Sequence, residues 1–362
     1  MADTYRAAVV GCGGMGRRHA SVYAGLPKAN VVAAADMHQG SLDIFPERTG
    51  VTNTYLNYRE MLEREKPDLV SVTTWENSHC EIVVAAAESG AKGIMCEKPM
   101  AMNLYEADEM IAACDRMGTI LAIGHMRRYN QFYLKAKQLI DAGQLGEVQR
   151  MHAYCRGWDL FLWGTHYADM LYFLNDDQPV EWVFGQISWK QHNMAYPESE
   201  SLRRRRGDLY IAEDDAIGYM RFPNGVRAML ESGIHSPKDW APRGNLGGKC
   251  ELTIQGTQGL AIVSDVSLSY CTLESGRWFH SDPLTEEERA KHSHLQFEAE
   301  LQELIGCVET GKEHQLNGRR GRAALEMLLA IYESSRSREV VELPLKARDN
   351  PFLAMVQSGE LP

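Results

Sequence analysis

The stretch YRAAVVGCGGMGRRHA, residues 5–20, decides the fold of the first part of this 362-residue chain. A short apolar run ends at Val10 and is followed by Gly11, Gly13 and Gly16 in G-x-G-x-x-G spacing. The first glycine allows a tight turn, the second lets a phosphate approach the backbone, and the third lets the next helix pack closely. Free N–H groups at the start of that helix attract phosphate. The stretch therefore predicts a strand, a phosphate-binding turn and a helix.

A glycine-rich turn alone is also common in structural loops, and a second feature decides between the two interpretations. Residues 31–35, VVAAA, predict another buried strand, and Asp36 follows it directly. A carboxylate in this place accepts hydrogen bonds from the ribose hydroxyls of a dinucleotide. Met37 and His38 come next, with no arginine to meet a 2′-phosphate. We therefore expect NAD as the cofactor, in preference to NADP.

Length, composition and charge limit the class of protein. A chain of 362 residues with 44% hydrophobic residues predicts two domains with sizeable cores. The net charge of −11 argues against nucleic acid or an anionic membrane as the main partner. We expect no signal peptide and no membrane span. Eight scattered cysteines without a C-x-x-C pair favour reduced thiols and a cytoplasmic location. His292 and His294 lack further ligands nearby, so we assign no metal.

The order of apolar runs predicts two domains of different architecture. Strand-like and helix-like segments alternate up to about residue 125, which is typical of a parallel, doubly wound sheet. Later strand-like runs follow one another, as on both sides of the Pro-Asn-Gly turn at 223–225, which indicates a mostly antiparallel sheet. We predict an α/β chain with a Rossmann domain at 1–125, an α+β domain with a large open sheet at 126–362, and an extended tail after residue 344. Helices are expected at 41–48, 58–65, 81–89, 104–117, 129–142, 165–174, 295–310 and 321–335.

Four blocks of this sequence resemble the Gfo/Idh/MocA oxidoreductases, a family that includes glucose–fructose oxidoreductase and inositol dehydrogenase. They are DLVSVTTWENSHCEIVVAAAESGAKGIMCEKPMAMN at 68–103, IGHMRRYNQFYLKAKQLIDAGQLGEV at 123–148, EDDAIGYMRFPNGV at 213–226 and ELTIQGTQGLAIV at 251–263. The resemblance extends to about residue 340. It implies an NAD(H)-dependent enzyme that transfers hydride between nicotinamide and a hydroxyl or carbonyl of a sugar, cyclitol or glycoside. It also implies a homodimer or homotetramer packed through the sheet of the second domain, which binds the substrate.

Lys98 is the first predicted catalytic residue. It follows a buried strand at the carboxyl end of the sheet, where doubly wound folds bind ligands, and Pro99 restricts it to extended backbone. Its ammonium can donate to a substrate hydroxyl and stabilise negative charge that develops on the oxygen. The alternative is a surface salt bridge with Glu97. The resemblance places this lysine at the junction of nicotinamide and substrate and implies a cis bond before the proline.

His166 is the second predicted catalytic residue, because WGTHYADML resembles the family's G-x-H-x-x-D segment. A histidine there takes or orients the proton of the oxidised hydroxyl. The alternative is a core histidine on a helix face with Asp169 and Met170. Many family members carry an aspartate four residues before this histidine, where this chain has Leu162. We therefore expect His166 to work without a carboxylate at position 162.

The remaining site residues are assigned by the resemblance and by their place after the strands. Cofactor binding is predicted for Gly11, Gly13, Gly14, Met15, Gly16, Asp36, Thr74, Trp75, Asn77, His79, Glu97, Lys98 and Arg128. Substrate binding is predicted for Lys98, Tyr129, Trp158, Asp159, Trp163 and His166. The aromatic side chains before His166 could stack on a sugar ring or belong to the core.

Two further functions stay open at this point. One is a lyase or glycosidase with tightly held NAD, in which a transient oxidation acidifies a neighbouring C–H and no net redox occurs. The other is a non-enzymatic NAD-bound sensor, which would need neither Lys98 nor His166.

Overall fold

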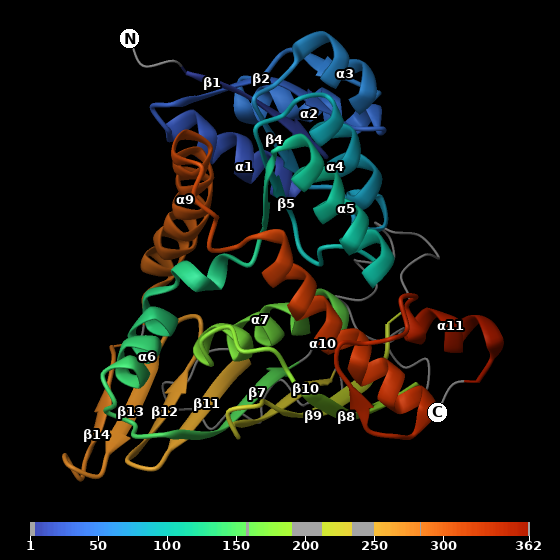
Figure 1. Cartoon of the computed structure of the whole chain (residues 1–362). Helices are drawn as coiled ribbons and strands as arrows, with labels where there is room; N and C mark the ends of the chain where they lie inside the picture. The colour runs from blue at the N-terminus through green and yellow to red at the C-terminus, as the bar shows by residue number, and fades with distance from the viewer. Residues whose placement is uncertain (1–3, 157–158, 190–211, 234–249, 283, 361–362) are drawn as a thin grey trace. The chain divides into compact units, whose positions relative to one another are not determined.

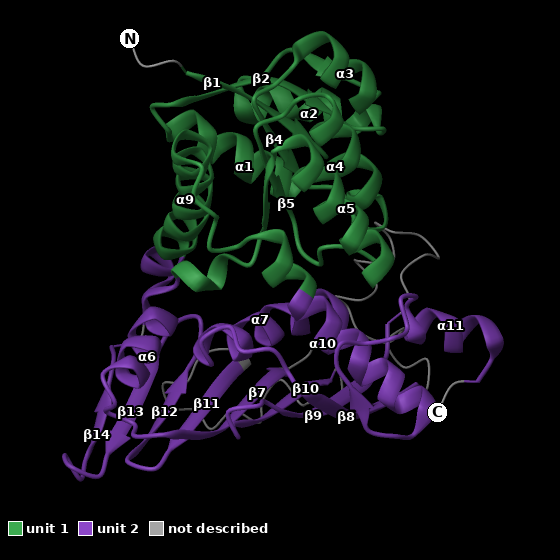
Figure 2. Cartoon of the chain, in the orientation of Figure 1, with its two compact units in different colours: residues 1–129, 290–322 green, residues 130–289, 323–362 purple. Residues whose placement is uncertain are grey.

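The computed structural model describes residues 4–156, 159–189, 212–233, 250–282 and 284–360 (Figure 1). It divides into two compact units (Figure 2). Unit 1 comprises residues 1–129 and 290–322, and unit 2 comprises residues 130–289 and 323–362. The sequence predicts that everything after residue 125 belongs to the second domain, whereas the structure groups 290–322 with the first unit. Segments so far apart in the chain leave no local signal of their association.

Unit 1 contains a six-stranded sheet in the order β3-β2-β1-β4-β5-β6. The strands are β1 (Tyr5–Val10), β2 (Ala29–Ala35), β3 (Thr54–Tyr55), β4 (Leu69–Val72), β5 (Gly93–Cys96) and β6 (Ile120–Ile123). All neighbouring strands pair in parallel. The strand order runs outward from β1 to β3 in one direction and from β4 to β6 in the other, so the order reverses beside β1. This confirms the predicted doubly wound sheet. Sheets of this kind generally bind ligands at the carboxyl ends of the strands, beside such a switch point.

Helices cover both faces of this sheet. They are α1 (Gly14–Gly25), α2 (Gln39–Thr49), α3 (Tyr58–Glu65), α4 (His79–Glu88), α5 (Leu104–Met117), most of α9 (Glu286–Thr310), and the short 3₁₀ helices η1 (Glu76–Ser78) and η2 (Met126–Tyr129). Figure 1 shows α1 and α9 on one side of the sheet and α4 and α5 on the other. Tyr23 of α1 and Leu301 of α9 share one apolar core cluster with Leu69 of β4. Burial on both faces explains why these strands are continuous apolar runs.

Unit 2 is built on a nine-stranded sheet in the order β14-β13-β12-β11-β7-β10-β9-β8-β15. The strands are β7 (Val148–Arg156), β8 (Trp182–Ser188), β9 (Asp215–Arg221), β10 (Arg227–Gly233), β11 (Cys250–Gly256), β12 (Gly259–Val263), β13 (Leu268–Thr272), β14 (Trp278–His280) and β15 (Val341–Glu342). Among these described strands, β7 and β10 pair in parallel and the other neighbours are antiparallel. The predicted mostly antiparallel sheet is confirmed.

One face of this sheet is covered by helices. They are α6 (Gln131–Asp141), the π-helix η3 (Leu160–Gly164), α7 (Thr165–Leu174), most of α10 (Gly318–Ser337) and α11 (Pro351–Ser358). Figure 1 shows α6, α7 and α10 along the same face. A Cβ on Gly185 or Gly218 would lie 2.9 Å and 2.3 Å from side-chain atoms of Ile331. The two glycines therefore allow α10 to pack directly on β8 and β9.

In the part of the chain that the structure describes, the opposite face of the sheet is open. Buried and exposed residues alternate along β8 and β9, as expected for a sheet with one covered face. Phe184, Ile217 and Tyr219 point to the open face and are 51%, 42% and 37% exposed. Large apolar side chains thus lie side by side on an uncovered surface.

The expected extended tail is wrong where α11 forms. The side chain of Asn350 accepts hydrogen bonds from the N–H groups of Phe352 and Leu353, and Pro351 occupies the first helical position. Both features are helix-start signals that were present in the sequence. Across the described ranges, none of the helices has the length and apolar character needed to cross a membrane.

Candidate active site

The turn between β1 and α1 has the conformation that the glycine spacing predicts. Gly11 has φ +98°, and a Cβ there would lie 2.7 Å from the carbonyl carbon of Thr73. A Cβ on Gly16 would lie 1.8 Å from the carbonyl oxygen of Gly11. A Cβ on Gly13 or Gly14 would meet nothing within 4 Å. The backbone at the N-terminus of α1 is therefore open to a pyrophosphate, whose oxygens can accept its N–H bonds.

Two other predicted cofactor residues accompany this turn. Asp36 lies at the carboxyl end of β2, and its two carboxylate oxygens accept hydrogen bonds of 2.8 Å from the backbone N–H groups of Cys12 and His38. A carboxylate has about four acceptor positions, so positions remain for ribose hydroxyls. Met15, in contrast, is partly buried against the core of unit 1.

The predicted cofactor residues in the segment after β4 differ in their exposure to solvent. Trp75 is 40% exposed, and Asn77 is exposed as well. His79 is only 1% exposed, with Nδ1 3.0 Å from the carbonyl oxygen of Pro99 and Nε2 3.1 Å from that of Thr74. Both ring nitrogens of His79 thus face backbone carbonyls of unit 1, a contact that the sequence analysis did not predict.

Glu97 is buried beside a histidine that the sequence analysis missed. Its Oε1 lies 3.1 Å from Nε2 of His19, and Nδ1 of His19 lies 3.0 Å from Oγ of Ser71. Burial alone would raise the pKa of Glu97, but the hydrogen bond and charge of His19, with the charge of Lys98, hold that pKa below its ordinary value. Lys98 is half-buried and the Lys98–Pro99 bond is cis. The carboxylate of Glu97 is 6% exposed, so its interaction with Lys98 does not take place at the open surface.

Arg128 of η2 is buried, and Tyr129 is partly buried. Arg128 is 2% exposed. The hydroxyl of Tyr129 donates a 2.9 Å hydrogen bond to Oε2 of Glu303 on α9. Burial, followed by the nearby charge of Glu303, raises the pKa of Tyr129 far above its ordinary value. The hydroxyl that we predicted to contact substrate is therefore engaged by α9.

The predicted substrate residues of unit 2 surround the start of α7. Trp158 lies outside the described residues. Asp159 is 3% exposed, and its Oδ1 accepts a 2.7 Å hydrogen bond from the N–H of Leu162, which caps η3. His166 is 4% exposed, and its ring lies 5.9 Å from that of Trp163, between centroids and tilted by 57°. Asp159 thus holds the backbone that leads into the histidine.

Glu213 is a buried acid that the sequence analysis did not single out. Its Oε1 accepts a 2.5 Å hydrogen bond from the N–H of Leu160, and its Oε2 accepts a 2.9 Å hydrogen bond from the hydroxyl of Tyr332. Burial, and then the negative charge of Asp159, raise the pKa of Glu213 from 4.5 to about 7. The segment before His166 therefore carries a pair of acids. The signal was present in the sequence, since Glu213 begins the block EDDAIGYM.

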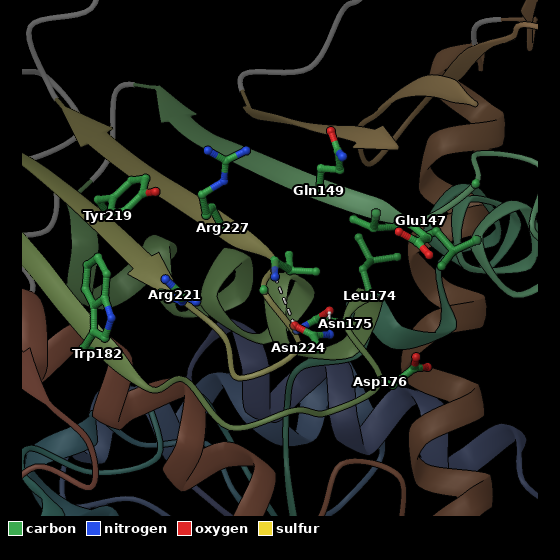
Figure 3. A pocket seen from close by; sticks show the side chains of 15 residues that line it. Glu147, Gln149, Leu174, Asn175, Asp176, Trp182, Tyr219, Arg221, Asn224 and Arg227 are labelled. Carbon is green, nitrogen blue, oxygen red and sulfur yellow. Dashed lines mark hydrogen bonds between the residues drawn. The ribbon is translucent and has the colours of Figure 1, made fainter. Parts of the chain in front are cut away.

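A cavity of about 710 Å³ lies elsewhere in unit 2 (Figure 3). Tyr219 and Arg221 of β9 and Arg227 of β10 line it, and Asn224 donates a 2.9 Å hydrogen bond to Asn175 at its edge. Its lining includes no residue of the predicted site, so this cavity and the predicted chemistry do not coincide. In the part of the chain that is described, no three His, Cys, Asp or Glu side chains gather as metal ligands would.

Two family models match this chain. One is described as the oxidoreductase family, NAD-binding Rossmann fold, and matches residues 5–125. The other is described as the C-terminal alpha/beta domain of the same oxidoreductase family and matches residues 160–343. Together they cover both units.

Individual proteins are similar over most of the chain. Scyllo-inositol 2-dehydrogenase (NAD(+)) of Bacillus subtilis is 24% identical over 356 residues, which cover 96% of this chain and 98% of that protein. A 2,7-anhydro-N-acetylneuraminate hydratase of Mediterraneibacter gnavus is 28% identical over 272 residues, 70% of this chain and 65% of that protein. A solved oxidoreductase structure from Agrobacterium radiobacter, in complex with NAD+, L-tartaric acid and magnesium, shares the fold with a TM-score of 0.78 at 19% identity, covering 93% of this chain and 98% of that one.

Proposed function

Because the chain belongs to the Gfo/Idh/MocA oxidoreductase family, we propose that it transfers hydride between NAD and a hydroxyl or carbonyl carbon of a cyclitol or sugar. The observation that carries this proposal is the open glycine turn beside the anchored carboxylate of Asp36. The similarity to an inositol dehydrogenase along nearly the whole chain supports a polyol as the substrate.

The residues of unit 1 suit NAD. The pyrophosphate would lie on the backbone at Gly13 and Gly14, where any side chain would fill the space. The carboxylate of Asp36 would accept the ribose hydroxyls and repel a 2′-phosphate. When bound, NAD supplies the acceptor for the hydride.

We assign the remaining chemistry to two side chains. The ammonium of Lys98 donates to the substrate oxygen and stabilises its negative charge as the C–H bond breaks and the hydride leaves. His166 accepts the proton of the same hydroxyl, so that the C–O bond becomes a carbonyl. In the reducing direction His166 returns this proton. Trp163, whose ring lies beside that of His166, offers an apolar surface to the C–H groups of a sugar or cyclitol ring.

A second candidate is a lyase or hydratase with NAD held tightly through the cycle. The similarity to a hydratase over 70% of the chain favours it. In this reaction the hydride returns to the substrate after the elimination or addition, so no reduced cofactor accumulates. The same Lys98 and His166 would serve both reactions.

A panel of inositols, aldoses and glycosides with NAD+ tests the proposal. We expect reduced nicotinamide, followed by its absorbance, in proportion to a ketone or lactone product found by chromatography. A product without reduced cofactor would support the second candidate. NAD binding without any turnover across the panel would support a non-enzymatic sensor instead.

We also propose that the chain forms a homodimer or homotetramer through the open face of the nine-stranded sheet. The exposed Phe184, Ile217 and Tyr219 support this, because adjacent apolar side chains on an uncovered face favour association. Light scattering at micromolar concentration should give a multiple of the chain mass, and a monomer would contradict it. A cytoplasmic location remains a proposal that rests on the sequence.

A further inference from the structure

A buried histidine contacts each of the two residues that flank Lys98. His19 of α1 is 0% exposed and lies 3.1 Å from the carboxylate of Glu97, the residue before Lys98. His79 of α4 is 1% exposed and lies 3.0 Å from the carbonyl oxygen of Pro99, the residue after it. We infer that His19 and His79 are positioning residues that fix Lys98 from both sides. This inference rests on the proposed role of Lys98.

The His19 side links Lys98 to the start of the cofactor helix. A carboxylate only accepts hydrogen bonds, so Nε2 of His19 donates to Glu97. The other oxygen of Glu97 accepts a 3.3 Å hydrogen bond from the backbone N–H of Lys98. Nδ1 of His19 is held by Ser71 on β4, whose hydroxyl donates to Tyr23 of α1 at 3.3 Å. The orientation of Glu97 is thus fixed by two elements before it reaches Lys98.

The His79 side links Lys98 to the segment after β4. Nε2 of His79 lies 3.1 Å from the carbonyl oxygen of Thr74, and Nδ1 faces Pro99. A carbonyl oxygen also only accepts, and a neutral imidazole carries one N–H, so the tautomer decides which of the two carbonyls receives the hydrogen bond. The ring therefore connects the ends of two neighbouring strands, β4 and β5, at the edge of the sheet where Lys98 emerges.

These contacts matter because the position of a charge-stabilising group must be accurate. A displacement of about 1 Å at a reacting group can lower turnover by about a hundredfold. Lys98 lies beyond the last residue of β5, so the ladder of the sheet does not hold it. Instead, the two histidines hold the neighbours of Lys98: His19 holds the side chain of Glu97, and His79 holds the carbonyl group of Pro99.

Matched amide substitutions separate the contacts of each histidine. The side-chain nitrogen of asparagine can replace Nδ1 of histidine, and that of glutamine can replace Nε2. At position 79, asparagine retains the contact with Pro99 and glutamine retains the contact with Thr74. At position 19, glutamine retains the contact with Glu97 and asparagine retains the contact with Ser71. The contacts beside Lys98 therefore require opposite amides at the two positions.

We expect the better amide to be asparagine at position 79 and glutamine at position 19, when turnover of the full chain is measured with NAD+ and its best substrate. We call this the crossed order. His79→Asn should exceed His79→Gln in kcat by about tenfold, and His19→Gln should exceed His19→Asn by a similar factor, with KM nearly equal within each pair. Histidines with a merely structural role would give equal kcat within each pair, and that result would overturn the inference. Equal melting temperatures within each pair would exclude a folding defect as the cause of the crossed order.

A second readout does not depend on turnover. Reductive methylation of the full chain without NAD, followed by peptide mass spectrometry, gives the reactivity of Lys98 relative to the exposed Lys66. We expect this ratio to change severalfold in His79→Gln and His19→Asn compared with their matched partners, and equal ratios would overturn the inference. The proposed function fails separately, if Lys98→Ala retains its turnover while the methylation ratios still follow the crossed order.

Discussion

Glu97 in unit 1 and Glu213 in unit 2 are both buried acids next to a predicted catalytic segment, yet their pKa values move in opposite directions. Burial would raise the pKa of Glu97, but the hydrogen bond from His19 and the nearby positive charges lower it. Burial raises the pKa of Glu213, and the neighbouring Asp159 raises it further, to about 7. Burial is common to both, so the partner decides the direction.

This difference indicates how each unit can support its part of the reaction. Glu97, paired with His19, stays charged and holds the backbone N–H of Lys98 in place. A carboxyl group facing another acid holds its proton close to neutral pH, in the segment that leads to the proton-accepting histidine. The contrast predicts that the residues of unit 1 position the reacting groups and stabilise charge. It predicts that the residues of unit 2 transfer protons.

The largest expected effect is that of His166→Ala. Loss of the proton acceptor should lower kcat by about a hundredfold or more, because general base catalysis contributes about that much. Stopped-flow measurement of hydride transfer checks this, with the melting temperature as the control for folding. If Asp159→Asn abolished turnover and His166→Ala did not, the proton role would belong to the acid pair.

Lys98→Ala tests the other half of the comparison. Turnover should fall by about a hundredfold, the usual loss for one preorganised donor to a developing oxyanion. The affinity for NAD, measured by calorimetry, should change little, since other residues are proposed to hold the cofactor. Lys135→Ala, an exposed lysine of unit 2, is the matched control. Near-normal turnover of Lys98→Ala would reject the assignment.

Asp36→Ala should give a smaller effect that is specific to cofactor choice. Without the carboxylate, ribose hydroxyls lose an acceptor and a 2′-phosphate is no longer repelled. The ratio of kcat/KM for NAD over NADP should fall by about tenfold. Asp43→Ala, on the exposed side of α2, should leave the ratio unchanged. A wild-type protein that used both cofactors equally would show that Asp36 is misassigned.

The smallest effect is expected for Asp159→Asn. The pKa of Glu213 is raised from 4.5 to about 7 in the folded state. Glu213 therefore stabilises the folded state most at pH values below 4.5, and this stabilisation is lost as the pH rises to about 7. Removing the charge of Asp159 lowers the pKa of Glu213, so less stability should be lost over this range, while turnover changes little. Melting temperatures across the range check this. Identical profiles for wild type, Asp159→Asn and Glu213→Gln would contradict it.

The sequence predicts well what depends on local pattern. The glycine turn, β5 and α5 appear where apolar runs and helix stops placed them, because each is encoded within a few residues. The helix α9 begins at Glu286 instead of at 295, since Thr285 and Glu288 form a reciprocal cap. That signal was local and could have been found.

What the sequence did not predict depends on pairing across the chain. His19 contacts Glu97 only after α1 packs on the sheet, and Glu213 meets the segment at Asp159 only after β9 joins its sheet. Neither partner is near in sequence. Tyr129 and His79 were assigned to ligands from their place in a motif, whereas the folded unit engages both internally. Motif position thus does not predict the contacts that each side chain makes.

The most direct test of the account follows the hydride itself. The full chain is incubated with NAD+ and a cyclitol or sugar substrate that carries deuterium at the carbon to be oxidised, and both products are analysed by mass spectrometry. The account predicts one deuterium in the reduced nicotinamide for each carbonyl formed, with no deuterium left at that carbon. Product that keeps its deuterium while the cofactor stays oxidised and unlabelled would contradict it.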